Sequence, residues 1–381
     1  MAKKILFLNP SVRDYRVPFY DLLNQEYDVK FLFYHSDYWI KDKFPEMKRW
    51  NYQILREYRF FGYTRGFTPH LIWKFFTEDY DVAINQDVFS FASHVGFLIT
   101  KLRGKKWISW EEMWIYPKNK LARIIYPYHK FILNHSDACV AAGSKAKILL
   151  EKVGVKQNKI FIGPNSAKNL VNLAQEEKIS VIKQKYDLND KIVFSFVGRI
   201  MDAKGVDILI NAFNKLNSEK NNLKLLIIGY SDKDNTEYFN KCKKLAHKNQ
   251  DIIFVGRQEA GNLANHLCAS DIFVLPSKFA FEIADCTESW GMVVNEAMSC
   301  SKAILASTAA GSTYDLVKEG VNGFIFKENS EIELVNVMEK ILLSDYKAFG
   351  IESKNIITNH FNYNEMLRGF KKAITFAINK K

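Results

Sequence analysis

The sequence is poor in cysteine. It contains five cysteines among 381 residues, and no two of them stand as a Cys-x-x-Cys pair. The odd count and the scattered placement argue against a disulfide framework and against a zinc site. We therefore expect a protein of a reducing compartment.

Long apolar runs are also missing. The apolar part of the first ten residues, MAKKILFLNP, is too short for a signal peptide. No run approaches the length of a membrane-spanning helix. The expectation is a cytoplasmic protein, bound at most peripherally to the inner face of a membrane.

Negative charge is in deficit. Lys and Arg number 54 against 42 Asp and Glu, which gives a net charge of +12 and a pI near 9.2. Nucleic-acid binding is disfavoured because no basic motif of a known reader module is present. Attraction to an anionic membrane or substrate remains open. Codon bias also remains open as the cause of the lysine excess, since the chain is rich in Lys, Asn and Ile.

Short β-branched and apolar runs alternate with helix-length amphipathic segments, which indicates parallel sheets built from βαβ units. The chain is too long for one ordinary core, so we predict an α/β protein with two doubly wound, Rossmann-like domains. Six strands are predicted in each half: Ile5–Leu8, Val29–Tyr34, Val82–Ile84, Trp107–Ser109, Ala138–Ala141 and Ile160–Ile162, then Ile192–Val197, Lys224–Gly229, Ile252–Val255, Ile272–Leu275, Ala303–Ala306 and Gly323–Phe326.

The domain boundary is placed within GPNSAKNL, which gives domains of residues 1–165 and 166–381. Packing of the last helix, about residues 361–381, back on the N-terminal domain is left open. Ligands of open α/β sheets sit outside the carboxyl ends of the strands. Two such edges that face each other would form a cleft.

One motif, FVGRIMDAKG, follows a predicted strand. Gly198 ends that strand, and Arg199 and Lys204 lie in the loop before a helix. Two cations in a strand-to-helix loop suit a diphosphate, because Arg grips oxygens in a fork and Lys supplies a point charge. The alternative is that both side chains only extend into solvent.

Another motif, ESWGMVVNEAMSC, predicts a tight turn at Gly291 and a helix from Met292 to Met298. Glu288 then precedes the helix and Glu296 lies inside it. A carboxylate accepts two hydrogen bonds from neighbouring hydroxyls, as sugars and riboses offer them, and the helix start favours a phosphate. The alternative is a helix cap at Glu288 and a surface Glu296. In the later segment STAAGSTYDLV, the backbone amides of Gly311, Ser312 and Thr313 are a further candidate phosphate cradle.

The second half therefore resembles the C-terminal half of retaining GT-B glycosyltransferases of family 4, the sucrose-synthase-like group, from about Asn165 to Phe326. The resemblance rests on the order of its elements: GR…KG, LLIIG, IIFVGR, DIFVLPS, the two glutamates with EAM, and AAGS…DLV…GVNGF. It departs in the longer gap between PS and Glu288, where Glu282, Asp285 and Thr287 lie, and in Ser301 and Ala303 after EAM.

The resemblance implies a nucleotide-sugar donor that is bound as a co-substrate, with no metal site and no cofactor. By motif match, Arg199 and Lys204 hold the diphosphate, Glu296 holds the ribose hydroxyls, and Glu288 faces the donor sugar. The match extends the predicted donor site to Gly198, Gly256, Gln258, Gly291, Met292 and Val293, with the base near Gly256 and Gln258.

The N-terminal half carries weaker signals. Arg13, Asp14, Tyr15 and Arg16 replace the Gly-Gly of many family members, and the strand KKWISW ends at Glu111 and Glu112, where the family often places a catalytic histidine or acid. The alternative for these two acids is a solvated turn. The stretch Tyr58–Phe76 interleaves basic and aromatic residues, which suits a membrane surface or else a core helix with a basic outer face.

Together with these patterns, the resemblance implies a retaining glycosyltransferase of cell-surface polysaccharide or lipid-linked oligosaccharide assembly. The resemblance implies a front-face route in which the leaving diphosphate helps to deprotonate the acceptor hydroxyl. The expected partners are a nucleotide-sugar donor, a glycan or lipid-linked acceptor and an anionic membrane, with no nucleic acid. Two alternatives stay open: a nucleotide-sugar epimerase of the same fold and a non-catalytic sugar-nucleotide-binding protein.

Overall fold

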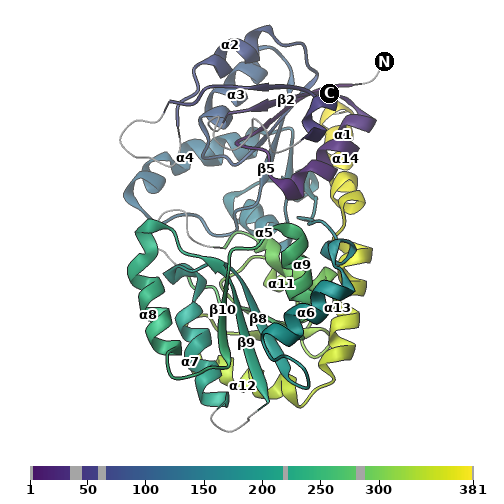
Figure 1. The fold of residues 1–381 in the computed structure, drawn as a ribbon. Coiled ribbons are helices and arrows are strands. Elements are labelled where there is room, and N and C mark those ends of the chain that lie inside the picture. Colours follow the sequence, from purple (N-terminus) through teal and green to yellow (C-terminus); the bar gives the residue numbers. More distant parts are fainter. Residues whose placement is uncertain (1–2, 35–44, 59–65, 218–221, 280–287, 380–381) are drawn as a thin grey trace. The chain divides into compact units, whose positions relative to one another are not determined.

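The computed structural model describes residues 3–34, 45–58, 66–217, 222–279 and 288–379 (Figure 1). Its contacts divide the chain into two compact units. The first consists of residues 1–166 and 362–381, and the second of residues 167–361. The first boundary lies one residue after the predicted one, and the C-terminal segment belongs to the first unit.

The first unit is built on a parallel sheet of seven strands in the order β3-β2-β1-β4-β5-β6-β7. Six of these strands were predicted, and β3 was not. The strands are β1 (Lys4–Asn9), β2 (Asp28–Phe33), β3 (Asn51–Ile54), β4 (Val82–Gln86), β5 (Lys106–Glu111), β6 (Ala138–Ala141) and β7 (Ile160–Ile162).

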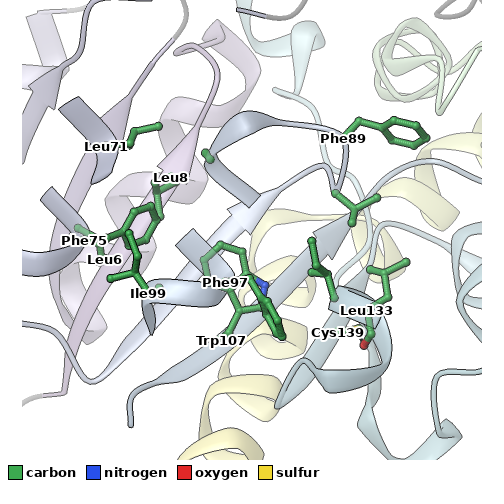
Figure 2. Packing of buried hydrophobic residues seen from close by; sticks show 14 of the residues in the cluster. Leu6, Leu8, Leu71, Phe75, Phe89, Phe97, Ile99, Trp107, Leu133 and Cys139 are labelled. Atoms are coloured by element: carbon green, nitrogen blue, oxygen red, sulfur yellow. Dashed lines mark hydrogen bonds between the residues drawn. The ribbon is translucent and has the colours of Figure 1, made fainter. Parts of the chain in front are cut away.

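Helices cover both faces of this sheet, because successive side chains of a strand point to opposite faces. Ile5 and Phe7 of β1 pack under α1 and α14, whereas Leu6 and Leu8 pack in a second cluster under α2, α3, α4 and α5 (Figure 2). The helices are α1 (Val17–Glu26), α2 (His70–Thr77), α3 (Phe91–Leu102), α4 (Lys120–His135), α5 (Ser144–Val153) and α14 (Tyr363–Asn379).

The second unit repeats the plan with six parallel strands in the order β10-β9-β8-β11-β12-β13. Both sheets therefore confirm the predicted α/β, Rossmann-like class. The elements are β8 (Ile192–Arg199), β9 (Leu223–Tyr230), β10 (Ile252–Gly256), β11 (Ile272–Leu275), β12 (Ala303–Ser307) and β13 (Gly323–Phe326), with α6 (Glu176–Lys185), α7 (Val206–Asn217), α8 (Thr236–Ala246), α9 (Ala260–Cys268), α10 (Met292–Ser299), α11 (Thr313–Leu316), α12 (Glu331–Leu342) and α13 (Tyr346–His360).

Each sheet has one point where the strand order reverses. In the second sheet this point lies between β8 and β11, since β8 pairs with β9 on one side and with β11 on the other. In the first sheet it lies between β1 and β4. The carboxyl ends of the two strands at such a point diverge and leave room for a ligand.

Candidate functional site

The loops that follow β8 and β11 meet at the reversal point of the second sheet. After β8 the chain forms a short 3₁₀ turn, η6 (Asp202–Lys204), and reaches α7 through Gly205, whose φ is +64°. A Cβ atom at Gly205 would lie 2.0 Å from the carbonyl oxygen of Pro276. The glycine thus lets the two loops touch through their backbones.

Lys204 and Glu288 lie together at this point. The Nζ of Lys204 forms an ion pair with Oε2 of Glu288, and both side chains are largely buried. Ser277 Oγ donates to the same carboxylate oxygen over 3.4 Å. The structure therefore brings together the residues predicted to hold the diphosphate and to face the sugar. In the structure these two residues hold each other.

Lys278, in the loop after β11, also connects this loop to the loop after β8. Its backbone N–H donates to the carbonyl of Ala203 over 2.9 Å. Its Nζ lies 3.0 Å from a carboxylate oxygen of both Asp202 and Asp207. The sequence analysis did not single out Lys278 or Asp207. A signal was available in the cation directly after the PS pair and in the acid two residues after Gly205.

Asp207 is the buried centre of this network. Its side chain accepts hydrogen bonds from Tyr238 Oη and Lys241 Nζ, both over 2.7 Å, besides its contact with Lys278. Burial raises the pKa of the Asp207 carboxyl, but the hydrogen bonds from Lys241, Tyr238 and Lys278 outweigh it and lower the pKa to about 2. The turn that presents Lys204 is thus fixed by charge-assisted bonds.

We expect Asp207→Asn to remove a pH-dependent part of the stability. The folded pKa of about 2 lies below the usual value of 3.8 for an aspartate, so the carboxylate stabilises the fold above pH 3.8 and loses this effect as the pH falls toward 2. The variant should lose about 2 kcal/mol of unfolding free energy at neutral pH. Urea unfolding at several pH values measures the difference, which should shrink in acid. Asp234→Asn, an exposed neighbour, is the control, and parallel curves for Asp207→Asn and wild type would contradict the assignment.

Arg199 lies at the end of β8, after Gly198, and its side chain is half exposed. Its Nη1 is 3.5 Å from Asp232 Oδ2, a loose contact that leaves the guanidinium accessible to a ligand. At the end of β10, Gly256 has a φ of +84°, and Gln258 Nε2 donates back to the Val255 carbonyl over 3.5 Å. The carboxyl edge of the second sheet therefore carries all the residues predicted near the diphosphate and the base.

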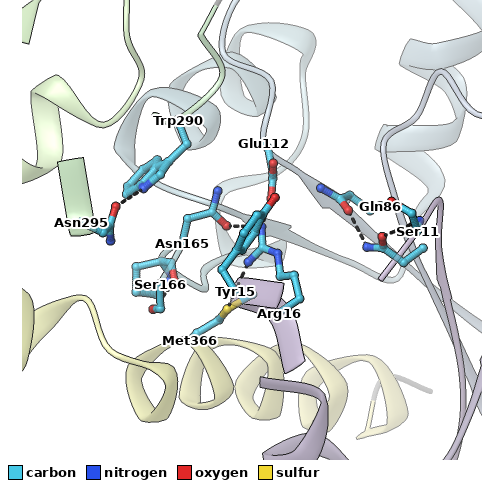
Figure 3. Close-up of polar contacts among 12 residues, drawn as sticks. Ser11, Tyr15, Arg16, Gln86, Glu112, Asn165, Ser166, Trp290, Asn295 and Met366 are labelled. Carbon is cyan, nitrogen blue, oxygen red and sulfur yellow. Dashed lines mark hydrogen bonds and ion pairs between the residues drawn. The ribbon is translucent and has the colours of Figure 1, made fainter. Parts of the chain in front are cut away.

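The start of α10 offers unused backbone donors. Gly291 precedes the helix with a φ of +90°. In the part of the chain that the structure describes, no protein acceptor meets the N–H groups of Met292 and Val293. The helix orientation is fixed nearby, where Trp290 Nε1 donates to Asn295 Oδ1 over 2.8 Å (Figure 3). Glu296 lies one turn into α10, half buried.

The predicted phosphate cradle at Gly311 to Thr313 is wrong. The N–H of Gly311 donates to the Glu288 carbonyl over 3.1 Å, that of Ser312 to Trp290 over 3.0 Å, and that of Thr313 to Ala310 over 3.3 Å. These amides are used to hold the Glu288 segment against the loop after β12. Each of these amides is therefore already bonded to a backbone carbonyl of the protein.

Glu111 and Glu112, at the end of β5, do not form a solvated turn. Glu111 is 3% exposed. Glu112 forms an ion pair with Arg16, which is 2% exposed. The same guanidinium donates to Asn165 Oδ1 over 2.8 Å (Figure 3). It also lies over the Trp110 ring, 4.6 Å from the ring centroid. The end of β5 is therefore a buried polar site in which Arg16 holds Glu112, and not a solvated turn.

The reversal point of the first sheet carries a further polar pair. Asn9 ends β1, and its Nδ2 donates to Oε1 of Gln86, at the end of β4, over 2.5 Å (Figure 3). Asn9 Oδ1 also accepts from the Ser11 N–H over 3.3 Å. Sequence reasoning missed both residues, although amides that directly follow buried strands were a usable signal.

Metal ligation finds no support among the described residues, where no three His, Cys, Asp or Glu side chains gather in a suitable group. Two Asp-x-Asp segments occur, but Asp79 pairs with Lys4 and Asp232 lies beside Arg199. Glu282, Asp285 and Thr287, singled out in the sequence, lie outside the described residues.

Comparisons with known proteins bear on the whole chain. Residues 179–361 match the family described as glycosyl transferases group 1. An uncharacterized glycosyltransferase of Methanocaldococcus jannaschii, MJ1069, is 28% identical over 333 residues, which cover 81% of this chain and 79% of the relative. The lipopolysaccharide 1,2-N-acetylglucosaminetransferase of Salmonella typhimurium is 26% identical over 190 residues, 48% of each chain.

The crystal structure of HepE from Anabaena, in complex with UDP, is similar to this chain with a TM-score of 0.79. The match has 17% identity and covers 98% of this chain and 99% of that one. At this identity the likeness concerns the fold alone, and it extends over both units.

Proposed function

We propose that this chain is a retaining glycosyltransferase with a nucleotide-sugar donor, because residues 179–361 match the family of glycosyl transferases group 1. The fold class is GT-B, as the sequence predicted. The acceptor we propose is a glycan or a lipid-linked sugar of cell-surface polysaccharide assembly. The lipopolysaccharide transferase among the relatives supports this setting.

The observation that carries the proposal is the convergence of Lys204, Glu288 and the start of α10 at the reversal point of the second sheet. A cation and free N–H groups suit a diphosphate, while a carboxylate suits sugar hydroxyls. In the proposed reaction Lys204 and Arg199 stabilise the negative charge that develops on the leaving diphosphate. Glu296 accepts from the ribose hydroxyls, and the base lies by Gly256 and Gln258.

The chemical step we propose is a front-face transfer. The bond between the sugar C1 and the diphosphate oxygen breaks, and the acceptor oxygen forms a new bond to C1 on the same face. The acceptor proton passes to the leaving diphosphate, so no covalent enzyme intermediate is needed. In the first unit, Glu111 and Glu112 would orient the acceptor, with Glu112 held by Arg16.

A donor screen tests the proposal and its independence of metal. We expect one class of nucleotide sugar to raise the melting temperature selectively, because a ligand at a hundred times its Kd adds about 2.7 kcal/mol. UDP-sugars come first, since the HepE structure contains UDP. The selected donor should then be consumed with a glycan acceptor, and the rate should survive EDTA.

The same screen separates the alternatives. Conversion of the donor without any acceptor would indicate an epimerase. Donor binding without turnover over a broad acceptor panel would indicate a binding protein. Strict dependence on added Mg²⁺ or Mn²⁺ would overturn the metal-free reaction.

For its location we propose the cytoplasm, at the inner face of the membrane. Among the described residues, no helix is long and apolar enough to cross a bilayer. The net charge of +12 favours peripheral contact with anionic lipid.

A further inference from the structure

Helices α2, α3 and α4 form one layer over a face of the first sheet. Their inner residues, among them Phe75, Phe97 and Leu133, join the cluster around Trp107 (Figure 2). The layer is continuous: Arg103 Nη1, just after α3, donates to the Phe75 carbonyl of α2 over 2.5 Å. Ring contacts connect α3 to α4. The outer sides of these helices are therefore parts of one surface.

The outer side of this layer is unusually apolar. Trp73 of α2 is 68% exposed, Leu102 of α3 is 80% exposed, and Ile124 of α4 is 75% exposed. Single exposed apolar residues are common on proteins. Here each of the three helices contributes more than one, and the full set is Ile72, Trp73, Phe76, Leu98, Leu102, Leu121, Ile124 and Phe131.

The same three helices contain no acidic residue. Their sequences, HLIWKFFT, FASHVGFLITKL and KLARIIYPYHKFILNH, hold Lys and Arg but neither Asp nor Glu. Lys74 and Lys101 pair with acids that lie just outside the helices. In the described part of the chain, no carboxylate pairs with the three cations of α4: Lys120, Arg123 and Lys130.

Apolar and cationic residues form two neighbouring stripes along α4. Leu121, Ile124 and Phe131 are spaced by three and seven residues, which places them on one side of a helix. Lys120, Arg123 and Lys130 have the same spacing, one residue earlier, and so lie alongside. All six are exposed, while Ala122, His129, Ile132 and Leu133 face the core.

We propose that the outer face of α2, α3 and α4, with α4 at its centre, docks on an anionic lipid bilayer. Apolar side chains enter the headgroup boundary, and the adjacent cations meet lipid phosphates. A lipid surface accounts for both stripes at once, whereas a soluble polyanion would leave the apolar stripe in water.

This assignment goes beyond the sequence prediction. That prediction rested on Tyr58–Phe76, of which residues 59–65 lie outside the described residues. The α2 part of that stretch has an aromatic outer face in place of the basic one expected for a core helix. The inference rests on the proposed membrane location but not on the proposed chemistry.

Vesicle sedimentation of the full chain tests the face. Wild type should bind phosphatidylglycerol vesicles more tightly than phosphatidylcholine vesicles, and less tightly in high salt. The variant Lys120→Gln/Arg123→Gln/Lys130→Gln should lose roughly a hundredfold in affinity. Ile124→Ser should lose roughly tenfold. Since all these side chains are exposed, melting curves should stay unchanged.

Matched controls come from the second unit. Lys178→Gln/Lys244→Gln/Lys248→Gln removes the same net charge from exposed positions, and Ile332→Ser removes an isoleucine that is 69% exposed. Both should bind like wild type. Equal losses of vesicle affinity in the variants and in the controls would overturn the assignment of this face to lipid binding. So would an Ile124→Ser variant that binds vesicles normally but dissociates a dimer, which would indicate a second copy as occupant. Glycosyl transfer to a soluble acceptor, measured without lipid, reports separately on the chemistry.

Discussion

Replacing Lys204 by alanine is expected to lower the turnover of donor at least a hundredfold. The ammonium group is the partly buried cation of the proposed donor site, and the loss of one charge-stabilising donor typically costs two to three orders of magnitude in rate. Arg199→Ala should have a loss of the same order. Lys215→Ala is the control, since this lysine of α7 is exposed and pairs with Glu331 away from the loop. Turnover at the wild-type rate by both variants would refute the assignment.

The ion pair between Lys204 and Glu288 adds a second expectation. The proposed donor has to separate the two side chains or insert between them. Without donor, each side chain therefore binds the other in place of the ligand. The losses of turnover caused by Lys204→Ala and by Glu288→Gln should therefore be non-additive in a double-mutant cycle, because the two substitutions remove the same interaction. Additive losses would mean that the two residues act independently once donor is bound.

Glu288 and Glu296 should differ in the kind of loss they produce. Glu296→Gln should weaken binding of both the full donor and the bare nucleoside diphosphate, because the ribose is present in each. Glu288→Gln should leave diphosphate binding nearly intact and lower turnover of the full donor, as expected for a contact felt at the reacting sugar. Each lost charged hydrogen bond amounts to about 1.5–3 kcal/mol.

Titration calorimetry with diphosphate, beside turnover with the full donor, separates the two roles. Glu339→Gln is a suitable control because this glutamate of α12 is exposed and removes the same charge. Normal binding and normal turnover in both variants would make the pair structural.

The sequence was sufficient to predict the bounds of those strands that are continuous apolar runs. The strands β6, β7, β11 and β13 have their predicted bounds, because each is a short continuous run of mostly apolar residues, whether it lies inside its sheet (β6 and β11) or at the edge (β7 and β13). The strand β3, NYQI, was missed because two of its four residues are polar and none of its side chains is fully buried. A strand of this composition carries little of the apolar signal by which strands are predicted.

Contacts between distant segments set the limit for the site. Nothing local shows that the amides of Gly311 and Ser312 are consumed by the carbonyls of Glu288 and Trp290, since the partners lie more than twenty positions earlier. The burial of Arg16 beside Glu112 likewise depends on residues ninety-six positions apart. The motifs predicted that the candidate residues lie at the carboxyl edge of the second sheet, where the structure has them, but they could not show which of these residues are already bonded to other parts of the protein.

The C-terminal helix α14 has a consequence for how the chain is made. Its Phe370 lies 4.8 Å from Phe19 and 5.3 Å from Trp110, ring to ring, and it seals one face of the first sheet. During synthesis, seven strands of that sheet leave the ribosome before the whole second unit, and the helix that covers them follows it. At about 5–20 residues per second, the face stays bare for roughly ten to forty seconds. A chain that stalls in this interval exposes a large aromatic surface. We therefore expect chaperones that bind nascent chains to protect the first unit until α14 has been made.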